Sequence, residues 1–199
     1  RKFSLLRESP IGMVGATIVI FWILVAIFAP LLAPYDPNAN DYLVGPVGDP
    51  SGEHWLGTDN TARDVLSRLL YGFRLCMSFA LVISFLSALL GILIGGLQGY
   101  LGGWMDLLGQ RFIEIWSALP FLYVVILLGA IYGRSFALLV FVVAIFEWIG
   151  LSYYLRGEFY RLKNLAYVKA ARALGISETR IFFRHILPNA LTPVLTVLP

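Results

Sequence analysis

Long, uninterrupted apolar blocks constrain this chain more than any other feature of its sequence. Blocks of this kind occupy residues 11–32, 75–97, 107–132 and 135–155. A helix needs roughly 20 apolar residues to cross the hydrocarbon core of a bilayer. Charged residues make up only 14% of the sequence, whereas a soluble domain carries about a quarter. We therefore predict an all-α membrane protein, built as a bundle of several transmembrane helices.

Polar segments separate the apolar blocks and define the expected organisation. The expected parts are an N-terminal arm (1–10), a first transmembrane helix (11–34), a polar loop (35–74) and a transmembrane core (75–199) that includes a polar segment (156–185). The first block exceeds the roughly 7–15 apolar residues of a signal peptide, so we expect it to remain uncleaved. The last apolar run begins near Ile186 and stops at Pro199, so we expect the sequence to end inside a fifth span.

The distribution of lysine and arginine predicts which side each polar segment occupies. The loop 35–74 carries few basic residues among many acidic ones, whereas the segment 156–185 is rich in arginine and lysine. Basic residues near spans favour the cytoplasmic side. We predict a cytoplasmic N-terminus, an external loop 35–74 and a cytoplasmic segment 156–185, which agrees with four intervening spans.

Residues 63–73 have the pattern of an amphipathic helix. The apolar positions, which share one helical face, are Val65, Leu66, Leu69, Leu70 and Phe73. Thr61 can cap this helix, with Asp64 three residues later as in a capping box. We predict a helix that lies along the external membrane surface and leads into the next span.

Three features inside the apolar blocks suggest packing or transport roles. Gly91, Gly95 and Gly99 leave a small-residue stripe that lets another helix approach closely, in this bundle or in a paired subunit. Pro120 should kink the third span. Glu147 lies within the fourth span with no lysine or arginine partner in its helix. Such a carboxyl either lines a cavity or substrate path or is protonated and bonded to a neighbouring helix, and both alternatives remain open.

The stretch 164–189 predicts two short, separately capped helices. Asn164 can cap a helix that extends to Leu174, and Gly175 can end it in a left-handed conformation. Ser177 can cap the next helix. Ala170 and Ala171 present a small surface that suits docking into a groove of a partner.

Several other chemistries find little support in the sequence. His54 and His185 are isolated from other ligand-type residues, so no metal site is predicted. No GxxxxGK[ST] phosphate loop is present in the sequence, so nucleotide chemistry belongs on another chain. A membrane enzyme that uses His54, Asp59 and Asp64 and an ion-coupled transporter that uses Glu147 are the two rival functions. No nucleic-acid partner is predicted.

The stretch from Asn164 to Asn189 resembles the cytoplasmic coupling-helix loop of binding-protein-dependent ABC importers. The family pattern is Glu-Ala-Ala, three residues, Gly, nine residues, then Ile-x-Leu-Pro. Its matching positions here are Ala170, Ala171, Gly175, Leu187 and Pro188. Lys169 stands where the pattern has Glu, and His185 stands where it has the first Ile.

A second block resembles the external segment of the dipeptide, oligopeptide and nickel permease family. Its motif residues are Leu56, Gly57, Thr58, Asp59, Arg63 and Asp64. The run GGWMD at 102–106 is also similar to that family, and QRFIEIW at 110–116 most resembles its members for longer peptides and microcin C-like compounds. The resemblance covers about residues 10–199.

The resemblance implies a type I ABC importer permease with six helices. Its expected partners are a second permease, two ATP-binding subunits, a periplasmic or lipid-anchored substrate-binding protein, membrane lipid and a peptide substrate. ATP and Mg²⁺ would be bound by the ATPase partners, and this chain would carry no cofactor and make no covalent bonds. The implied location is the bacterial inner membrane, as a multi-pass protein. Nickel or glutathione is the alternative substrate.

The resemblance also assigns expected roles to individual residues. The ATPase-docking coupling helix would comprise Tyr167, Lys169, Ala170, Ala171, Leu174 and Gly175. Glu147 and Pro120 are candidates for the translocation path. The amphipathic segment 63–73 would either support docking of the binding protein or plug the outer mouth, and the sequence leaves this choice open.

Overall fold

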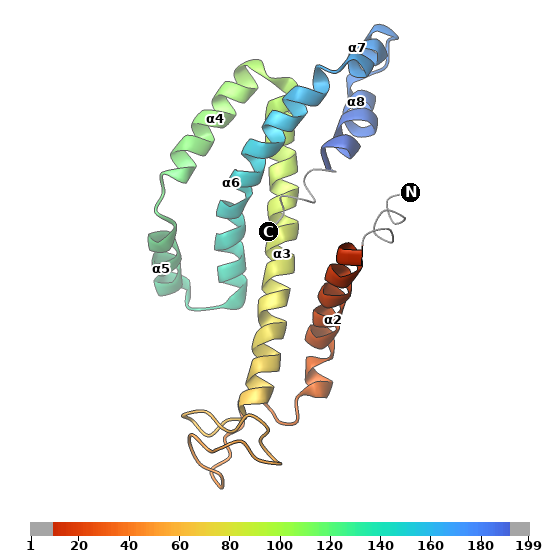
Figure 1. Ribbon diagram of the computed structural model, residues 1–199. Helices are drawn as coiled ribbons and strands as arrows, with labels where there is room; N and C mark the ends of the chain where they lie inside the picture. The colour runs from red at the N-terminus through yellow and green to blue at the C-terminus, as the bar shows by residue number, and fades with distance from the viewer. Residues whose placement is uncertain (1–9, 192–199) are drawn as a thin grey trace. The chain divides into compact units, whose positions relative to one another are not determined.

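The computed structural model describes residues 10–191 of the chain and, over that range, an all-α protein (Figure 1). The helices are α2 (Pro10–Leu32), α3 (Val65–Leu101), α4 (Gly103–Ser117), α5 (Phe121–Tyr132), α6 (Phe136–Lys163), α7 (Ala166–Ala173), α8 (Glu178–Ile181) and a π-helical segment, η1 (Phe182–Ile186). Extended pairing among the described residues is limited to one isolated bridge between Thr58 and Asp64. Residues 1–9 of the predicted arm (1–10) and residues 192–199 of the predicted fifth span lie outside the described residues.

The multi-span prediction is confirmed by helix length and composition. Within residues 10–191, α2, α3 and α6 are each long and apolar enough to cross a membrane. A fourth span results if α4 and α5 count as one broken span, because they pass the same test together and bend by 68° at their junction. Pro120 lies at that junction as the residue before α5, so the predicted kink at Pro120 is confirmed.

The structure divides into two compact units, with the division after Ala80. In the first unit, α2 is followed by a loop of irregular backbone that leads into the start of α3. The 23 residues of α2 extend about 35 Å at 1.5 Å per residue, enough for the hydrocarbon core. The residues between α2 and α3, 33–64, are called the 33–64 loop below. The rings of Trp22 on α2 and Phe73 on α3 lie 5.0 Å apart.

Residues 63–73, predicted to lie along the membrane surface and to lead into the next span, do not form a distinct surface helix. The segment forms the first turns of α3, which continues without a break from Val65 to Leu101. Gly72 is the weakest helix former in this stretch, and one glycine costs a helix only about 1 kcal/mol relative to alanine. The predicted cap at Thr61 is also wrong, because Asp64 caps α3 by accepting a hydrogen bond from the Ser67 N–H at 2.7 Å.

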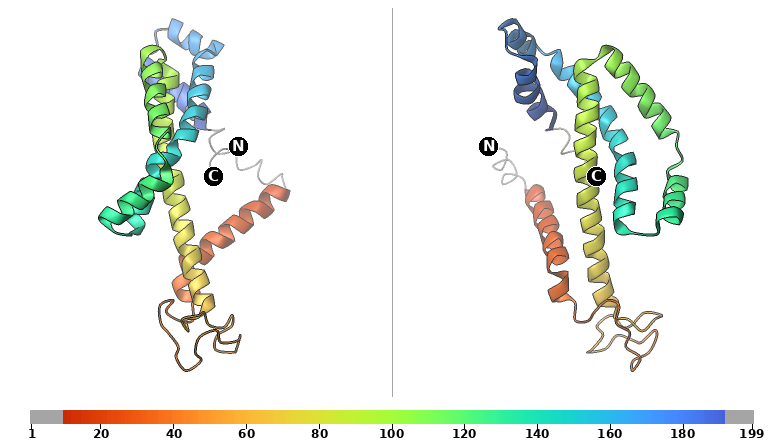
Figure 2. Two further views of the ribbon diagram at one scale, coloured as in Figure 1. Left: turned by 90° about the vertical axis from the view of Figure 1, so that its left-hand side faces the viewer. Right: turned by 180° about the vertical axis from the view of Figure 1, so that it is seen from behind.

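The second unit is built on close packing of α3 against α6 (Figure 2). A methyl group added at Gly91 would lie 2.9 Å from the Leu151 side chain, and one at Gly95 would collide with the backbone of Ser152. Gly99 meets the backbone of Arg156 in the same way. The glycine stripe therefore packs two helices of this chain together, in the first of the two arrangements that the sequence left open.

The helix α6 is longer than predicted and positions the segment that follows it. It continues to Lys163 rather than ending near residue 155. Its last turns bury Leu155, Phe159 and Leu162 in an apolar core shared with α7 and η1. This apolar stripe keeps the polar end of α6 helical, since packing of one face stabilises a helix more than propensity does.

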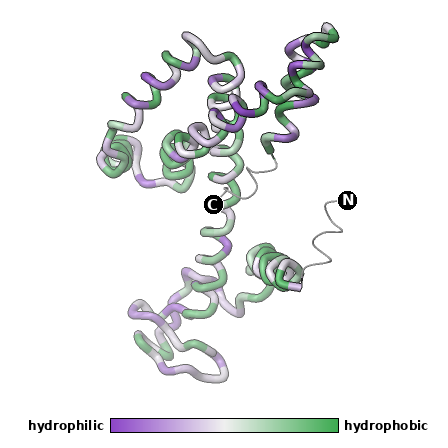
Figure 3. Tube along the Cα trace, turned by 45° about the horizontal axis from the view of Figure 1, so that its top comes forward, coloured by the Kyte–Doolittle hydropathy of each residue, from purple (hydrophilic) through white to green (hydrophobic). Residues whose placement is uncertain are grey.

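Hydropathy varies sharply along the chain (Figure 3). The strongly apolar stretches are α2, α5 and the first half of α6, whereas hydrophilic residues are most frequent in the 33–64 loop and around α7 and α8, with further ones along α4. Both hydrophilic regions are therefore suited to lie outside the bilayer.

Candidate functional site

The segment from Asn164 to Ile181, called the α7 loop below, contains a short helix that is defined at both ends. Asn164 ends α6 rather than beginning α7, and its side chain donates to the Tyr160 carbonyl at 2.9 Å. Leu165, in an extended conformation, precedes α7. The predicted cap of α7 at Asn164 is therefore wrong. This asparagine ends α6, and its side chain bonds to the last turn of α6 rather than to α7.

Gly175 ends α7 as predicted. Its φ is +74°, a conformation that costs glycine little because it has no Cβ. The Gly175 N–H donates to the Arg172 carbonyl at 3.0 Å and the Ile176 N–H donates to the Ala171 carbonyl at 3.1 Å. This pair of bonds is a Schellman motif, which satisfies carbonyls that the end of a helix would otherwise leave unpaired. Ser177 then precedes α8, although its side chain makes no capping bond.

The two faces of α7 differ in burial. Val168 and Ala171 are buried in the apolar core under the helix. Four of the predicted docking residues are exposed on the other side: Tyr167, Lys169, Ala170 and Leu174. The prediction that Ala171 belongs to the exposed surface is therefore wrong. A helical turn places Ala171 beside Val168, three residues earlier, on the face that the core covers.

A polar cluster, missed by sequence reasoning, joins α7, α8 and the end of α3. Arg172 donates to both carboxylate oxygens of Glu178, from Nε at 2.6 Å and from Nη2 at 2.9 Å. The Tyr100 hydroxyl donates to the same carboxylate. Opposite charges on either side of Gly175 were the only sequence signal, and the sequence could not show that Tyr100 would lie beside them.

The cluster shifts the titration of its carboxyl group. The hydrogen bonds from Arg172 and then from Tyr100 lower the pKa of Glu178 to about 2, although burial acts in the opposite direction. The same contact with Glu178 raises the pKa of Arg172. Both groups are therefore charged throughout the physiological range.

The motif residues of the 33–64 loop lie mainly in its interior. His54 is 1% exposed and lies between two carboxylates, with Nδ1 2.9 Å from Asp64 and Nε2 3.3 Å from Asp41. The ring of Tyr35 covers the imidazole at a centroid distance of 4.7 Å. Since ionised carboxylates only accept hydrogen bonds, this arrangement favours an imidazolium with both N–H groups donating.

The electrostatics of the loop agree with that assignment. The hydrogen bond to Asp64 is the main reason that the pKa of His54 is raised above its usual value. Burial raises the pKa of Asp64, but the hydrogen bonds from Ser67 and His54 outweigh burial and the net pKa is lowered. The hydrogen bond from His54 also lowers the pKa of Asp41.

Gly57, Thr58 and Asp59 shape the backbone around this cluster. Gly57 has φ +73° and its N–H donates to the His54 carbonyl at 2.9 Å. The Thr58 hydroxyl donates to the Gly45 carbonyl and accepts from the Gly48 N–H, both at 2.8 Å. Asp59 accepts from the Arg63 N–H at 3.0 Å and pairs with Arg68.

The remaining motif residues, Leu56 and Arg63, lie toward the loop surface. Leu56 is 48% exposed. Arg63 donates through Nε to the Asn40 side chain at 3.0 Å. Most of the motif residues thus form contacts that hold the loop together, and the exposed Leu56 remains available for contact with another molecule.

The trio proposed for a membrane enzyme does not form one site. His54 and Asp64 are paired, but Asp59 is engaged by Arg63 and Arg68 in a separate turn. A cavity of about 190 Å³ adjoins His54, Asp41 and Asp64. Within residues 10–191 there is no cluster of three His, Cys, Asp or Glu side chains suited to holding a metal ion.

Glu147 and Pro120 lie on different elements of the second unit. Glu147 is exposed on α6, and among the described residues it forms no ion pair or hydrogen bond. Its neighbour Trp148 is buried and donates to the Ile145 carbonyl at 2.9 Å. Trp116 of α4 donates to the same carbonyl, also at 2.9 Å, and so joins α4 to α6 just before the break at Pro120.

A second cavity lies beside the end of α3, the start of α4 and the last turns of α6. It has a volume of about 440 Å³ and is lined by Gly99, Asp106, Arg156, Gly157 and Tyr160. Asp106, the last residue of the GGWMD run, pairs with Arg156, whose Nη2 donates to it at 2.6 Å. This ion pair links the start of α4 to α6 and was not predicted from the sequence.

Comparison with known families gives two matches that together span most of the chain. Residues 87–199 match the binding-protein-dependent transport system inner membrane component. Residues 3–46 match the N-terminal transmembrane domain of oligopeptide transport permease C. The second unit of the structure, with its glycine stripe and α7 loop, thus falls almost entirely within the first match.

The similar curated proteins are named as permease proteins of transport systems. The peptidoglycan transport system permease protein YejE of Agrobacterium fabrum is 51% identical over 73% of this chain, which covers 38% of that protein. The inner membrane ABC transporter permease protein YejE of Escherichia coli is 47% identical over 75% of this chain and 44% of its own length. The oligopeptide transport system permease protein OppC of Bacillus subtilis is 34% identical over 96% of this chain and 63% of its own length. The chain thus spans less than two thirds of these relatives.

Proposed function

The chain belongs to the family of binding-protein-dependent transport system inner membrane components, and from that premise we propose that it is part of the permease subunit of an ATP-driven peptide importer. The family is one of transport components rather than of enzymes. Its relatives carry names for peptidoglycan, oligopeptide and dipeptide transport. ATP and Mg²⁺ would be bound by partner subunits, with this chain supplying the membrane path.

The observation that carries the proposal is that one face of α7 is buried and the other is exposed. One face is anchored in the apolar core through Val168 and Ala171, so that the helix is seated on the bundle. The other face leaves Tyr167, Ala170 and Leu174 exposed, with Leu174 at 81%. An anchored helix with a small, partly apolar free face suits docking into a groove on an ATP-binding subunit.

The proposed partners are those that membership of a binding-protein-dependent transport family implies. Two ATP-binding subunits would dock from the cytoplasm, one of them on α7. A second permease would pair with this one, and a substrate-binding protein, periplasmic or lipid-anchored, would deliver substrate to the opposite side. With α7 cytoplasmic, the basic N-terminus is also cytoplasmic and the 33–64 loop is external. The excess of basic residues in 156–185 supports that orientation.

Glu147 is the proposed polar lining residue of the substrate path. A carboxyl in a membrane-spanning helix is costly unless it faces a cavity, water or a partner. Its exposure on α6 supports a position that faces the second permease or the path between the two. The bend at Pro120 would let α4 and α5 follow different sides of that path.

Glutathione is the second candidate substrate. The glutathione transport system permease protein GsiD of Pectobacterium atrosepticum is 34% identical over 98% of this chain. Because glutathione is itself a short peptide, both candidates are consistent with one type of path. Uptake of labelled oligopeptide and labelled glutathione by the same reconstituted importer distinguishes them.

Co-purification with the candidate ATP-binding subunits tests the proposal. The full-length protein should retain them, and Ala170→Asp should lose them because it places a charge on the exposed face of α7. Thr179→Asp, at an exposed position on α8, is the matched control and should retain them. If wild type and control fail to bind any ATP-binding subunit, the importer assignment is wrong. If Ala170→Asp binds as well as wild type does, α7 is not the docking helix.

A further inference from the structure

The Arg172–Glu178–Tyr100 cluster is the main polar connection between the α7 loop and the end of α3. Its members come from three elements: Arg172 from α7, Glu178 from α8 and Tyr100 from α3. Glu178 accepts from Arg172 on both carboxylate oxygens, and the Tyr100 hydroxyl contacts both this carboxylate and the Glu178 carbonyl, the latter at 3.2 Å. A bidentate arginine–carboxylate pair fixes orientation as well as distance.

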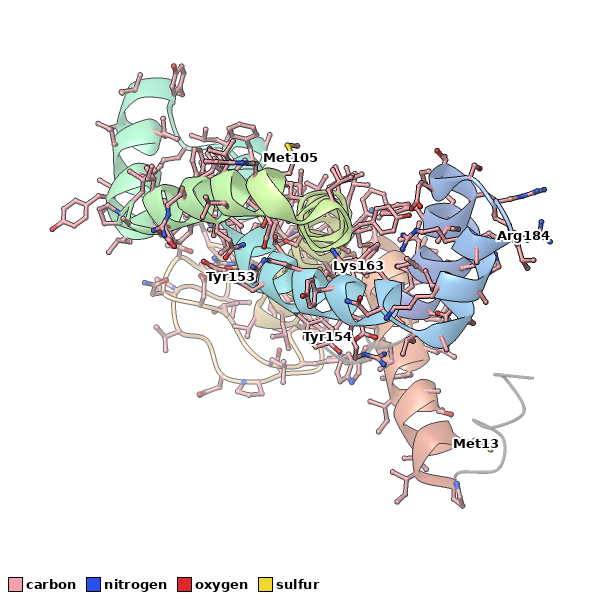
Figure 4. All side chains as sticks on the ribbon, turned by 90° about the horizontal axis from the view of Figure 1, so that it is seen from above. Met13, Met105, Tyr153, Tyr154, Lys163 and Arg184 are labelled. Carbon is pink, nitrogen blue, oxygen red and sulfur yellow. The ribbon has the colours of Figure 1, made fainter. Side chains whose placement is uncertain are left out.

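Tyr100 is held from its other side as well. Lys163, the last residue of α6, donates through Nζ to the Tyr100 carbonyl at 3.0 Å. Figure 4 shows the labelled Lys163 side chain beside the end of α3, which is viewed along its axis. The Tyr100 ring packs edge-to-face on Phe182 at 5.2 Å, and Phe182 lies 5.4 Å from Phe159 of α6. The end of α3 is thereby fixed to α6 and to the start of η1.

The α7 helix needs such a connection to act as a rigid body. It has eight residues, and an isolated helix of that length is not stable in water. Its apolar side is anchored by Val168 and Ala171, which resists withdrawal from the core. Apolar contacts are non-directional, however, so sliding and rotation of α7 over the core are restrained chiefly by directional bonds, which the cluster supplies.

We propose that Arg172, Glu178 and Tyr100 form a transmission clamp, in which Glu178 is the positioning residue that makes α7 move together with the ends of α3 and α6. This inference rests on the proposed function, in which α7 receives the movement of an ATP-binding subunit. The clamp lies beside the docking face and does not belong to it. It passes displacement of α7 to the transmembrane helices, and its loss lets α7 shift without moving them.

The clamp predicts a specific failure of coupling. In the full-length importer reconstituted with its ATP-binding subunits and binding protein, Glu178→Gln should retain the ATP-binding subunits and their hydrolysis. Substrate transported per ATP should fall at least about fivefold, the lower end of typical coupling between two sites. Tyr100→Phe keeps the ring against Phe182 and removes only the hydroxyl, so it should give a smaller fall in the same ratio.

Two further variants separate transmission from general damage. Glu158→Gln breaks an ion pair of similar type, Glu158–Arg161, which lies wholly within α6, and it should leave the transport-to-ATP ratio unchanged. The charge exchange Arg172→Glu with Glu178→Arg should restore much of the ratio lost in Glu178→Gln, because it rebuilds the pair in reverse. The amount of each variant in the membrane and its melting temperature identify any variant that fails to fold.

The outcomes distinguish this inference from the function on which it rests. If wild type binds no ATP-binding subunit, the proposed function fails and the clamp fails with it. If wild type binds but Glu178→Gln does not, the cluster belongs to the docking surface and the transmission role is wrong. If Glu178→Gln folds, binds and transports with the wild-type ratio, the clamp is refuted. A lower transport-to-ATP ratio in Glu178→Gln, with recovery of that ratio in the charge exchange, supports the clamp.

Discussion

The 33–64 loop and the α7 loop both carry the chain through a polar region, but different interactions hold them. The 33–64 loop has little regular structure and folds around a buried charged group, His54 between Asp41 and Asp64. The α7 loop is mostly helical and folds over an apolar core, with its charged cluster on the exposed side. In the first loop the charges are structural. In the second they connect α7 and α8 to the end of α3.

This difference matters because buried and exposed charges respond differently to change. Removing one partner from a buried pair leaves a charge without solvent or counter-ion, which is costly. Exposed pairs contribute little to stability, so the cluster of the α7 loop is suited to positioning α7 rather than to holding the fold together. We infer that the 33–64 loop keeps one shape and that the α7 loop is built to transmit movement.

The largest expected effect is a test of the apolar support under α7. Ala171→Asp places a carboxyl on the buried face, where Ala171 is 6% exposed, and should cost about 3–5 kcal/mol of stability. Ala170→Asp, one residue earlier on the exposed face, should change stability by less than about 0.5 kcal/mol. Thermal unfolding of the two full-length variants in the same detergent measures the contrast. Equal destabilisation would mean that α7 does not have distinct buried and free faces.

The second effect concerns the buried charges of the 33–64 loop. Asp64→Ala removes both the partner of His54 and the cap of α3, and should destabilise the loop by about 2 kcal/mol. Hydrogen exchange at the Gly57 and Val65 amides, which bond within the loop, should accelerate accordingly. Asp49→Ala removes an exposed carboxyl of the same loop and should leave exchange unchanged. Similar exchange in both variants would show that the buried pair does not hold the loop.

The smallest effect is the pH dependence of the same loop. The pKa of His54 is raised by Asp64, so its stabilising charge is fully present below about pH 6.5, the unperturbed histidine value. That contribution is lost as the pH rises through the folded-state pKa. Asp64, whose pKa is lowered, has the opposite pH dependence. Its contribution to stability is lost only in acid, as the pH falls through the folded-state pKa of its carboxyl group.

An NMR titration of labelled histidine measures this dependence. The signal that is lost in a His54→Gln variant of the full-length protein is assigned to His54. We expect its midpoint above about 6.5 in the otherwise native chain and a lower midpoint after Asp64→Asn, since the anionic partner is lost. A midpoint at or below the unperturbed value would contradict the imidazolium assignment.

Much of this organisation was predictable because it depends on local pattern. Span length and composition predicted α2 and the multi-span class, Pro120 predicted the break between α4 and α5, and Gly175 predicted the end of α7. Proline cannot continue a helix and glycine accepts a left-handed conformation at little cost. A long apolar helix is suited to the hydrocarbon core of a bilayer. Each prediction follows from one of these restrictions. The family resemblance was likewise carried by local motifs, and the family match confirmed it.

Tertiary packing decided what local pattern could not. Local pattern could not show that the apolar core under α7 would cover Ala171 and leave Ala170 exposed, or that α3 would begin at Val65 and include the expected surface helix. It also could not show that Tyr100 would meet Glu178, 78 residues away. Periodicity reports which residues share a helical face, but only the partner packed against that face determines whether it is core or surface. Composition and motif thus determined that this is a membrane transport component, and the packing of α3, α6 and α7 determined which of its residues are free to contact partners.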